Sequence, residues 1–396
     1  MGTPARVLVF TGKGGVGKST LAAATAVLSA DRGDRVMIVS SDPAHSLSDV
    51  FGTDAATEHT AVLPGLTVYE PDARNRLEQS WESIRAWFVD VLAWTGATTL
   101  EAEELAVLPG MEELFALTDV RELAMSGDYD VVVVDCGPTA ETIRLLSLPA
   151  VLGWYVDRVL PPSRRLNKMV GPLVQRLSDV PVPDDEVFAA ADRFTVALDQ
   201  VRQLLTDHER TSVRLVTTPE RVVLAEARRT HGYLSLFGYG IDSVVVNRLI
   251  PDDVGPALQG WVDEQAERLV EIEEAFTPLP IMPVALADRE AVGLEALRRL
   301  GQAVYGDDDP SRNRHPHEVI RLDLSSDDPT IEVDIPHAES GEVEVHRRGD
   351  ELSIGVGPYR SNLCLPEGLR RRSVRSAAMH DGTLRISFDG GQVGSS

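Results

Sequence analysis

A nine-residue stretch near the N-terminus constrains the fold of this chain more than any other segment. Residues 12–20 read G-K-G-G-V-G-K-S-T and fit the pattern G-x-x-x-x-G-K-[ST], in which backbone amides surround phosphate groups. The glycines allow the backbone to turn tightly enough. Residues 6–11 read as a buried parallel strand and residues 21–30 as a helix, so bound phosphates would meet a helix N-terminus. The sequence therefore predicts an α/β domain that binds a nucleotide.

Lysine is rare in this chain, and two of its three lysines, Lys13 and Lys18, lie in this loop. Lys18 offers a compact charge to the β- and γ-phosphate oxygens, where a planar guanidinium is too wide. Ser19 is placed to ligate Mg²⁺. Lys13 follows the first glycine, where an ordinary phosphate loop needs no lysine; the alternative is a solvated side chain at the mouth of the loop. The predicted phosphate-binding residues are Gly12, Lys13, Gly14, Gly15, Val16, Gly17, Lys18, Ser19 and Thr20.

The composition sets further bounds. The 396 residues are enough for two domains, and 43% of them are apolar, as in a globular protein with a packed core. The net charge of −24 argues against a nucleic-acid partner and leaves at most a transient contact with an anionic membrane. The first apolar run continues into the glycine-rich loop, so we expect that it is not a signal peptide, and no window reaches the roughly 18 apolar residues of a spanning helix. We expect a cytoplasmic protein.

Strand and helix patterns alternate over residues 1–305, as a doubly wound, mostly parallel sheet with flanking helices requires. Ligands of such sheets gather at the carboxyl ends of the strands, where Asp42, Asp135, Thr218 and Asn247 fall. The predicted strands are 6–11, 35–41, 66–70, 129–135, 212–218, 241–247 and 278–282.

Two loops at these strand ends are candidate switches that sense the γ-phosphate. Asp42 is placed to orient an attacking water, although an Asp followed by Pro43 also suits a helix N-cap. Asp135 would hold the water shell of Mg²⁺. Cys136 beside it is better explained by packing than by redox chemistry. The predicted switch residues are Asp42, Pro43, Ala44, His45, Asp135, Gly137, Pro138 and Thr139.

Two helical insertions, about 74–126 and 150–210, carry apolar stripes. Each stripe could be ordinary core, and together they could form a shared groove for an apolar cargo. The candidate groove residues are Trp87, Phe88, Val91, Met169, Val170 and Leu173.

The hydrophobic period changes to two after a polar linker at residues 306–316. Alternating apolar residues separated by Gly-containing turns predict a small antiparallel β-sandwich over residues 317–390. Residues 391–396 read as a disordered tail.

Four segments together resemble the arsenite-pump ATPase family, which includes the eukaryotic ATPase that delivers tail-anchored membrane proteins. They are the loop with Lys13, D-P-A-H-S-L at 42–47, P-G-M-E-E at 109–113 and D-x-x-P-T-x-x-T-x-R-L-L at 135–146. The β region is similar to an α-crystallin (small heat-shock) domain, as in a branch of the family with this domain at its C-terminus.

The resemblance implies a homodimeric ATPase that uses ATP and Mg²⁺. In the family, the extra lysine reaches the partner's nucleotide, which gives Lys13 a catalytic role like that of an arginine finger, beside Lys18 and Asp42. The adenine-binding asparagine of the family corresponds to Asn247, and its adenine-side loop to residues 280–293, which include Pro283.

The chain also departs from the family. Tail-anchor targeting members bind zinc through a C-x-x-C pair, but residues 260–263 read G-W-V-D, so we expect no zinc. Arsenite-responsive members need clustered thiolates, and Cys136 and Cys364 cannot supply a triad.

Three hypotheses about function remain. The leading one is a dimeric switch that opens and closes an apolar groove around a hydrophobic protein segment or other apolar cargo. The second is the motor subunit of an anion or arsenite pump. The third is a holdase-like chaperone whose β-sandwich binds clients under ATP control. A partition ATPase would need a basic DNA-binding face or a terminal amphipathic helix, which the acidic chain does not offer.

Overall fold

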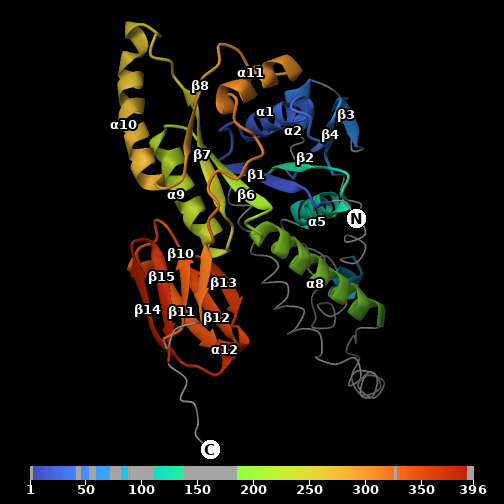
Figure 1. The fold of residues 1–396 in the computed structure, drawn as a ribbon, viewed down its shortest axis with the longest axis vertical. Coiled ribbons are helices and arrows are strands. Elements are labelled where there is room, and N and C mark those ends of the chain that lie inside the picture. Colours follow the sequence, from blue (N-terminus) through green and yellow to red (C-terminus); the bar gives the residue numbers. More distant parts are fainter. Residues whose placement is uncertain are drawn as a thin grey trace, which may run out of the picture.

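The computed structural model describes residues 3–41, 46–52, 59–71, 82–87, 89, 111–137, 185–324 and 328–389. Its N-terminal part contains an eight-stranded sheet with the order β3-β4-β2-β5-β1-β6-β7-β8, and only the β3–β4 pair is antiparallel (Figure 1). This arrangement confirms the predicted fold class. The strands are β1 (Arg6–Gly12), β2 (Val36–Ser40), β3 (Thr60–Leu63), β4 (Leu66–Tyr69), β5 (Val131–Asp135), β6 (Thr211–Thr217), β7 (Ile241–Leu249) and β8 (Ile281–Ala285).

Helices cover both faces of this sheet, because its strands are apolar on both sides. Leu8 and Phe10 of β1 face a core that includes α1, α2 and α11, whereas Val7 and Val9 face a core that includes α5, α8, α9 and α10. The helices are α1 (Lys18–Asp31), α2 (Ser46–Phe51), α5 (Met111–Ser126), α8 (Asp185–Thr206), α9 (Arg221–Leu236), the 3₁₀ turn η1 (Pro256–Leu258), α10 (Gln259–Phe276) and α11 (Leu294–Tyr305).

The strand expected at 278–282 begins later, at Ile281. Pro278 and Pro280 lack the N–H groups that a strand needs for its ladder, so pairing with β7 starts only after them. The short antiparallel strand β3 was not predicted; its residues are only partly buried and give no clear alternation.

The C-terminal part is a sandwich of two antiparallel sheets, with the orders β14-β15-β10-β9 and β11-β12-β13. Its core consists of the alternating apolar residues of the sequence pattern, such as Ile331 and Ile386, which face each other across β10 and β15. Its elements are β9 (Ile320–Asp323), β10 (Thr330–Asp334), the 3₁₀ turn η2 (Ser340–Glu342), β11 (Val343–Arg348), β12 (Glu351–Val356), β13 (Tyr359–Cys364), α12 (Glu367–Arg370), β14 (Val374–His380) and β15 (Thr383–Phe388).

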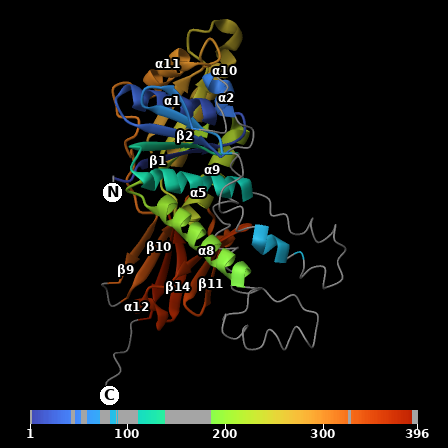
Figure 2. The same cartoon turned by 90° about the vertical axis from the view of Figure 1, so that its right-hand side faces the viewer.

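The sandwich packs beneath α9, as both side views show (Figures 1 and 2). Leu236 at the end of α9 belongs to the same apolar cluster as the sandwich core. The ring of Tyr233 lies 4.5 Å from that of Tyr359. The sandwich therefore shares a core with the nucleotide domain.

Much of the predicted groove lies outside the described residues, namely Phe88, Val91, Met169, Val170 and Leu173. Trp87 is described: residues 82–87 are helical, and its ring packs against a small core with Phe115 and Phe194 of α5 and α8. That packing is compatible with the ordinary-core interpretation of its stripe.

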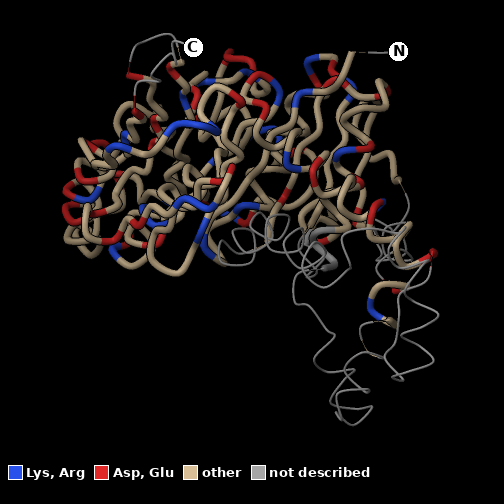
Figure 3. Tube along the Cα trace, turned by 90° about the horizontal axis from the view of Figure 1, so that it is seen from below, with Lys and Arg blue, Asp and Glu red and all other residues tan. Residues whose placement is uncertain are grey.

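The distribution of charge and the lengths of the apolar helices are relevant to the expected partners. Acidic and basic residues are interspersed along the trace in the view from below (Figure 3). In the part of the chain that the structure describes, no helix is long and apolar enough to cross a membrane.

Candidate functional site

The glycine-rich loop joins the carboxyl end of β1 to the first turn of α1. Two of its glycines are required, one by a close backbone contact and the other by its left-handed backbone conformation. A Cβ on Gly12 would lie 2.2 Å from the carbonyl oxygen of Val216, because β1 and β6 run side by side there. Gly17 precedes α1 with φ near 96°, and a Cβ there would lie 2.4 Å from the amide nitrogen of Asn247. The loop therefore fits closely between β1, β6 and β7.

Lys18 is the first residue of α1, and only 6% of it is exposed. Its Nζ lies 3.5 Å from the carbonyl oxygen of Lys13, so the side chain folds back along the loop. An ammonium at a helix N-terminus adds its charge to the positive end of the helix dipole. This corner of the molecule favours a bound anion such as a phosphate chain.

Asn247 supports the loop from the end of β7. Its Nδ2 donates a hydrogen bond to the carbonyl oxygen of Val16 at 2.8 Å, and its Oδ1 accepts one from the backbone N–H of Arg248 at 2.9 Å. On the adjacent strand β8, Pro283 pairs in register with Val246 of β7. Of the two residues predicted for the adenine, Asn247 therefore contacts the phosphate loop, and Pro283 lies on the next strand.

Lys13 extends toward helix α9. Its Nζ lies 3.8 Å from the Oε2 of Glu226, and the two side chains are 36% and 29% exposed. Glu226 was not predicted from the sequence, because a carboxylate on an amphipathic helix carries no local signal of such a contact.

Asp135 ends β5 and is fully buried. Its carbonyl oxygen accepts a hydrogen bond from the N–H of Ser41 at 2.8 Å, which joins the ends of β2 and β5. Cys136 follows it in the core beneath the sheet, as its packing role required. Gly137 is also buried. The other predicted switch residues, Asp42, Pro43, Ala44, His45, Pro138 and Thr139, lie outside the described residues.

Glu70 is a second carboxylate that sequence reasoning missed. It follows β4, is almost fully buried, and accepts hydrogen bonds from the N–H of Leu47 (3.0 Å), the N–H of Ser48 (3.4 Å) and the Oγ of Ser48 (2.7 Å). These donors belong to the first turn of α2, which begins directly after residues 42–45. Its position at a strand end on the ligand-binding edge was the available signal.

Helix α2 is also tied to the adenine-side loop. The carbonyl oxygen of Val50 accepts a hydrogen bond from the N–H of Gly293 at 2.9 Å. The first candidate switch is therefore followed by a helix that is fixed at one end by Glu70 and at the other by the start of α11.

The oxygen donors near the loop suit a hard cation. A hydroxyl from Ser19 in the first turn of α1 and a carboxylate from Asp135 are the ligand types that Mg²⁺ prefers, directly or through water. Among the described residues, no three His, Cys, Asp or Glu side chains gather closely enough to form a metal-binding cluster of their own. The expectation of no zinc stays a prediction.

Comparison with known proteins identifies the family. A family model described as "Anion-transporting ATPase" matches residues 5–306, and one described as "HSP20-like domain found in ArsA" matches residues 327–388. The "Putative arsenical pump-driving ATPase 1" of Aquifex aeolicus is 35% identical over 395 residues, which cover 96% of this chain and 99% of that protein. A "Putative arsenical pump-driving ATPase" of Chlorobaculum tepidum is 35% identical over 97% of this chain and 96% of its own. The "ATPase GET3B" of Arabidopsis thaliana is 28% identical over 77% of this chain and 80% of its own. With its phosphate loop, parallel sheet and C-terminal sandwich, this chain is a member of the anion-transporting ATPase family that carries the HSP20-like domain of that family.

Proposed function

We propose that this ATPase is a cytoplasmic homodimer that uses its nucleotide cycle to bind and release a hydrophobic protein segment or other apolar cargo. The observation that carries the proposal is the direction of Lys13. Its ammonium lies against Glu226 on α9, at the partly exposed mouth of the loop. Lys18 already provides the buried ammonium of the loop. A second lysine turned outward suits a phosphate that belongs to another subunit.

Within one subunit the residues divide the work. The loop amides and Lys18 bind the β- and γ-phosphates, and Asn247 and Pro283 border the adenine. Ser19 and Asp135 would hold Mg²⁺, which neutralises charge on the phosphates when bound. Asp42 orients the attacking water, and the segments that begin at Asp42 and Asp135 respond to the γ-phosphate.

The pump-motor alternative takes its support from the names of the relatives. A thiolate site for arsenite needs several sulfur ligands close together. Cys136 is buried in the core of the nucleotide domain, whereas Cys364 is exposed at the end of β13 in the sandwich. This distribution favours a cargo other than a thiophilic anion.

The ATP-regulated holdase receives less support from the sandwich surface. Its described large apolar side chains are buried in its core or partly buried against it, apart from the exposed Leu322 and Leu324 at β9. The outward positions of β11 carry Glu344, His346 and Arg348. A client-binding surface would need a wider apolar patch.

The test is to trap the cargo. The Asp42→Asn protein should bind ATP without turning it over, and in ATP it should crosslink to apolar peptides or copurify with an apolar cargo. The Lys18→Ala protein, which should not bind ATP, is the matched control. Equal capture by both variants, with or without ATP, would rule out a nucleotide-gated cargo site.

A further inference from the structure

The sandwich approaches α9 so closely that one position on the helix must be glycine. A Cβ on Gly232 would lie 2.7 Å from the carbonyl oxygen of Pro336. At the residue before Gly232, the Nδ1 of His231 lies 3.3 Å from the Nε2 of His337, and one turn after Gly232, Leu236 enters the sandwich core. The contact therefore combines a close backbone approach with a shared apolar core, and it is not a loose tether.

The segment predicted as a linker is also fixed in place. Arg32, which follows α1 directly, donates hydrogen bonds to the carbonyl oxygens of Gly306, Asp307 and Asp308. Arg6 of β1 donates to that of Ser311 at 3.2 Å. The Nδ2 of Asn313 donates to the carbonyl oxygen of His208 at 3.0 Å. Residues 306–313 thus form a strap along the nucleotide domain, leading to the sandwich.

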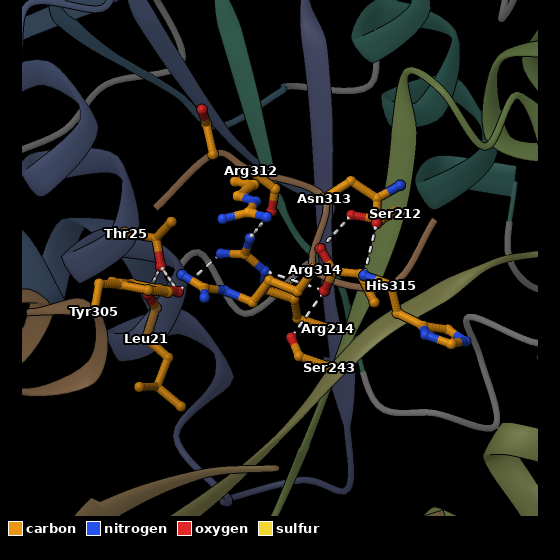
Figure 4. A network of polar contacts seen from close by, with 12 residues as sticks. Leu21, Thr25, Ser212, Arg214, Ser243, Tyr305, Arg312, Asn313, Arg314 and His315 are labelled. Atoms are coloured by element: carbon orange, nitrogen blue, oxygen red, sulfur yellow. Dashed lines mark hydrogen bonds and ion pairs between the residues drawn. The ribbon is translucent and has the colours of Figure 1, made fainter. Parts of the chain in front are cut away.

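A fully buried arginine joins this strap to the helix of the phosphate loop (Figure 4). Arg214 on β6 pairs with Asp242 (Nε to Oδ1, 3.4 Å) and donates to the carbonyl oxygen of Arg312 at 3.2 Å. It also donates to the hydroxyl of Tyr305 at 2.9 Å. A buried arginine is rare and needs all of these partners to offset its lost hydration.

From Arg214 through Tyr305 to Thr25, each residue donates its hydrogen bond to the next. Thr25 Oγ1 donates its hydrogen to the carbonyl oxygen of Leu21 at 2.7 Å, so at the 2.7 Å contact between the two hydroxyls Tyr305 is the donor. Leu21 and Thr25 lie in the first two turns of α1, directly after Lys18 and Ser19. Helix α11, which ends at Tyr305, packs closely against α1: a Cβ on Gly301 would lie only 2.8 Å from the carbonyl oxygen of Ala24.

The two elements that hold the sandwich, helix α9 and the strap, are therefore both connected to the nucleotide site. Helix α9 carries Glu226, the partner of Lys13, two turns before its contact with the sandwich. Helix α1 carries Lys18 and is tied to the strap through Tyr305 and Arg214.

We infer that the HSP20-like sandwich acts on the nucleotide site of its own chain, as a docked brace that fixes the positions of α1 and α9. The polar outer positions of its strands agree with this role better than with client binding. The brace raises ATP affinity, because the ordering of both helices no longer has to occur when the nucleotide binds.

The test begins with Gly232→Ala, which forces the sandwich away from α9. Hydrogen exchange should show reduced protection of β10 and of the strap, and ATP affinity should fall about five-fold or more, as expected for coupling between two sites. Gly260→Ala in α10 is the matched control, since no atom lies within 4 Å of its added Cβ and both changes favour a helix. Normal protection in the Gly232→Ala protein would contradict the docked arrangement. Lost protection with unchanged ATP affinity would show that the sandwich does not act on the site.

Tyr305→Phe tests the second connection without disturbing the first. It removes only the hydroxyl between Thr25 and Arg214 and keeps the ring that packs against Arg314. Protection at the α9 contact should stay normal while ATP affinity falls. ATP affinity equal to that of the unmodified protein in this variant would refute the strap as a route to α1. The measurements are made without cargo, so the outcome does not depend on the cargo cycle.

Discussion

Lys13 and Glu226 form an ion pair within one subunit, with 3.8 Å between Nζ and Oε2. Both side chains are partly exposed, and such pairs contribute only about 0–1 kcal/mol. A triphosphate in a closed, water-excluded site offers a far stronger attraction. In the proposed cycle, the pair would therefore hold Lys13 in the open dimer without hindering its transfer to a phosphate.

This weak pairing predicts unequal effects of removing its two members. Lys13→Ala should lower kcat by about 10³-fold or more, as expected for a charge that acts at the transition state. Glu226→Gln should change kcat by less than about five-fold, because it removes at most about 1 kcal/mol from the open state. Steady-state phosphate release measures both. A loss in Glu226→Gln as large as that in Lys13→Ala would place Glu226 in the reaction itself.

Glu70 gives a prediction about the first candidate switch. Glu70→Ala removes the acceptor for three hydrogen bonds at the start of α2, and it should lower stability by about 1–3 kcal/mol. Because α2 follows residues 42–45 directly, kcat should also fall, by about 10–100-fold, while ATP still binds. Denaturant unfolding, ATP titration and kcat separate these effects. Ser48→Ala removes only one of the three donors, so its stability and kcat should lie between those of the unmodified protein and of Glu70→Ala. Normal kcat in a folded Glu70→Ala protein would show that the hydrogen bonds from Glu70 to α2 contribute to stability alone.

These residues show how far the sequence alone could lead. The phosphate loop and its flanking elements were predictable, because glycine geometry and hydrophobic period are local properties. Glu226 and Glu70 were not, since their contacts join segments that are distant in the sequence. The strands β9 and β14 carry a weaker signal in the sequence for another reason: they are edge strands without fully buried residues, so the apolar alternation seen at Ile331 and Val333 is weak there. The arginine network was missed because nothing in a strand sequence such as T-S-V-R-L-V-T marks its Arg214 as buried.

The interface between α9 and the sandwich should be sensitive to acid. Burial first, and then the neighbouring His337 and His315, lower the pKa of His231 to about 3, although the nearby carboxylate of Asp334 opposes them. Burial and Arg228 lower the pKa of His337 as well. The unfolded chain therefore binds these protons more readily, so the contribution of these two groups to stability is fully present above about pH 6.5 and decreases as the pH drops toward 4 and 3. Asp334, whose pKa is lowered to about 2, stays ionised in this window.

Thermal unfolding and hydrogen exchange at pH 7.5, 6 and 5 measure this effect. A cavity of about 370 Å³ lies beside His231. We expect a lower Tm and weaker protection of β10 at pH 5, and a smaller change in the His231→Gln protein. The same acid response in that variant would assign the effect to other groups.

The positions of the two cysteines predict no response to thiophilic anions. Arsenite and antimonite should leave the ATPase rate unchanged, because Cys136 is buried in one domain and Cys364 is exposed in the other. The measurement compares the unmodified protein with a Cys136→Ser, Cys364→Ser double variant. A several-fold stimulation that disappears in the double variant would support the pump-motor alternative.

The trans role of Lys13 has the sharpest test, because it predicts which mixed dimers regain activity. Lys13→Ala and Asp42→Asn proteins should each be nearly inactive alone. If Lys13 serves the partner's nucleotide, a mixed dimer has one site with both defects and one site with neither.

Such dimers should regain up to about half of the wild-type activity, by the logic of a charge supplied in trans. If Lys13 serves its own site, each site of the mixed dimer carries one defect and the mixture stays inactive. Formation of mixed dimers is verified with two affinity tags, and Lys18→Ala mixed with Asp42→Asn is the control, since both residues should act within their own subunit. Recovery only in the Lys13 mixture would show that the Lys13 ammonium acts on the nucleotide of the partner subunit. Inactive mixed dimers would show that Lys13 acts within its own subunit, and they would remove the main support for a dimer that closes on the nucleotide.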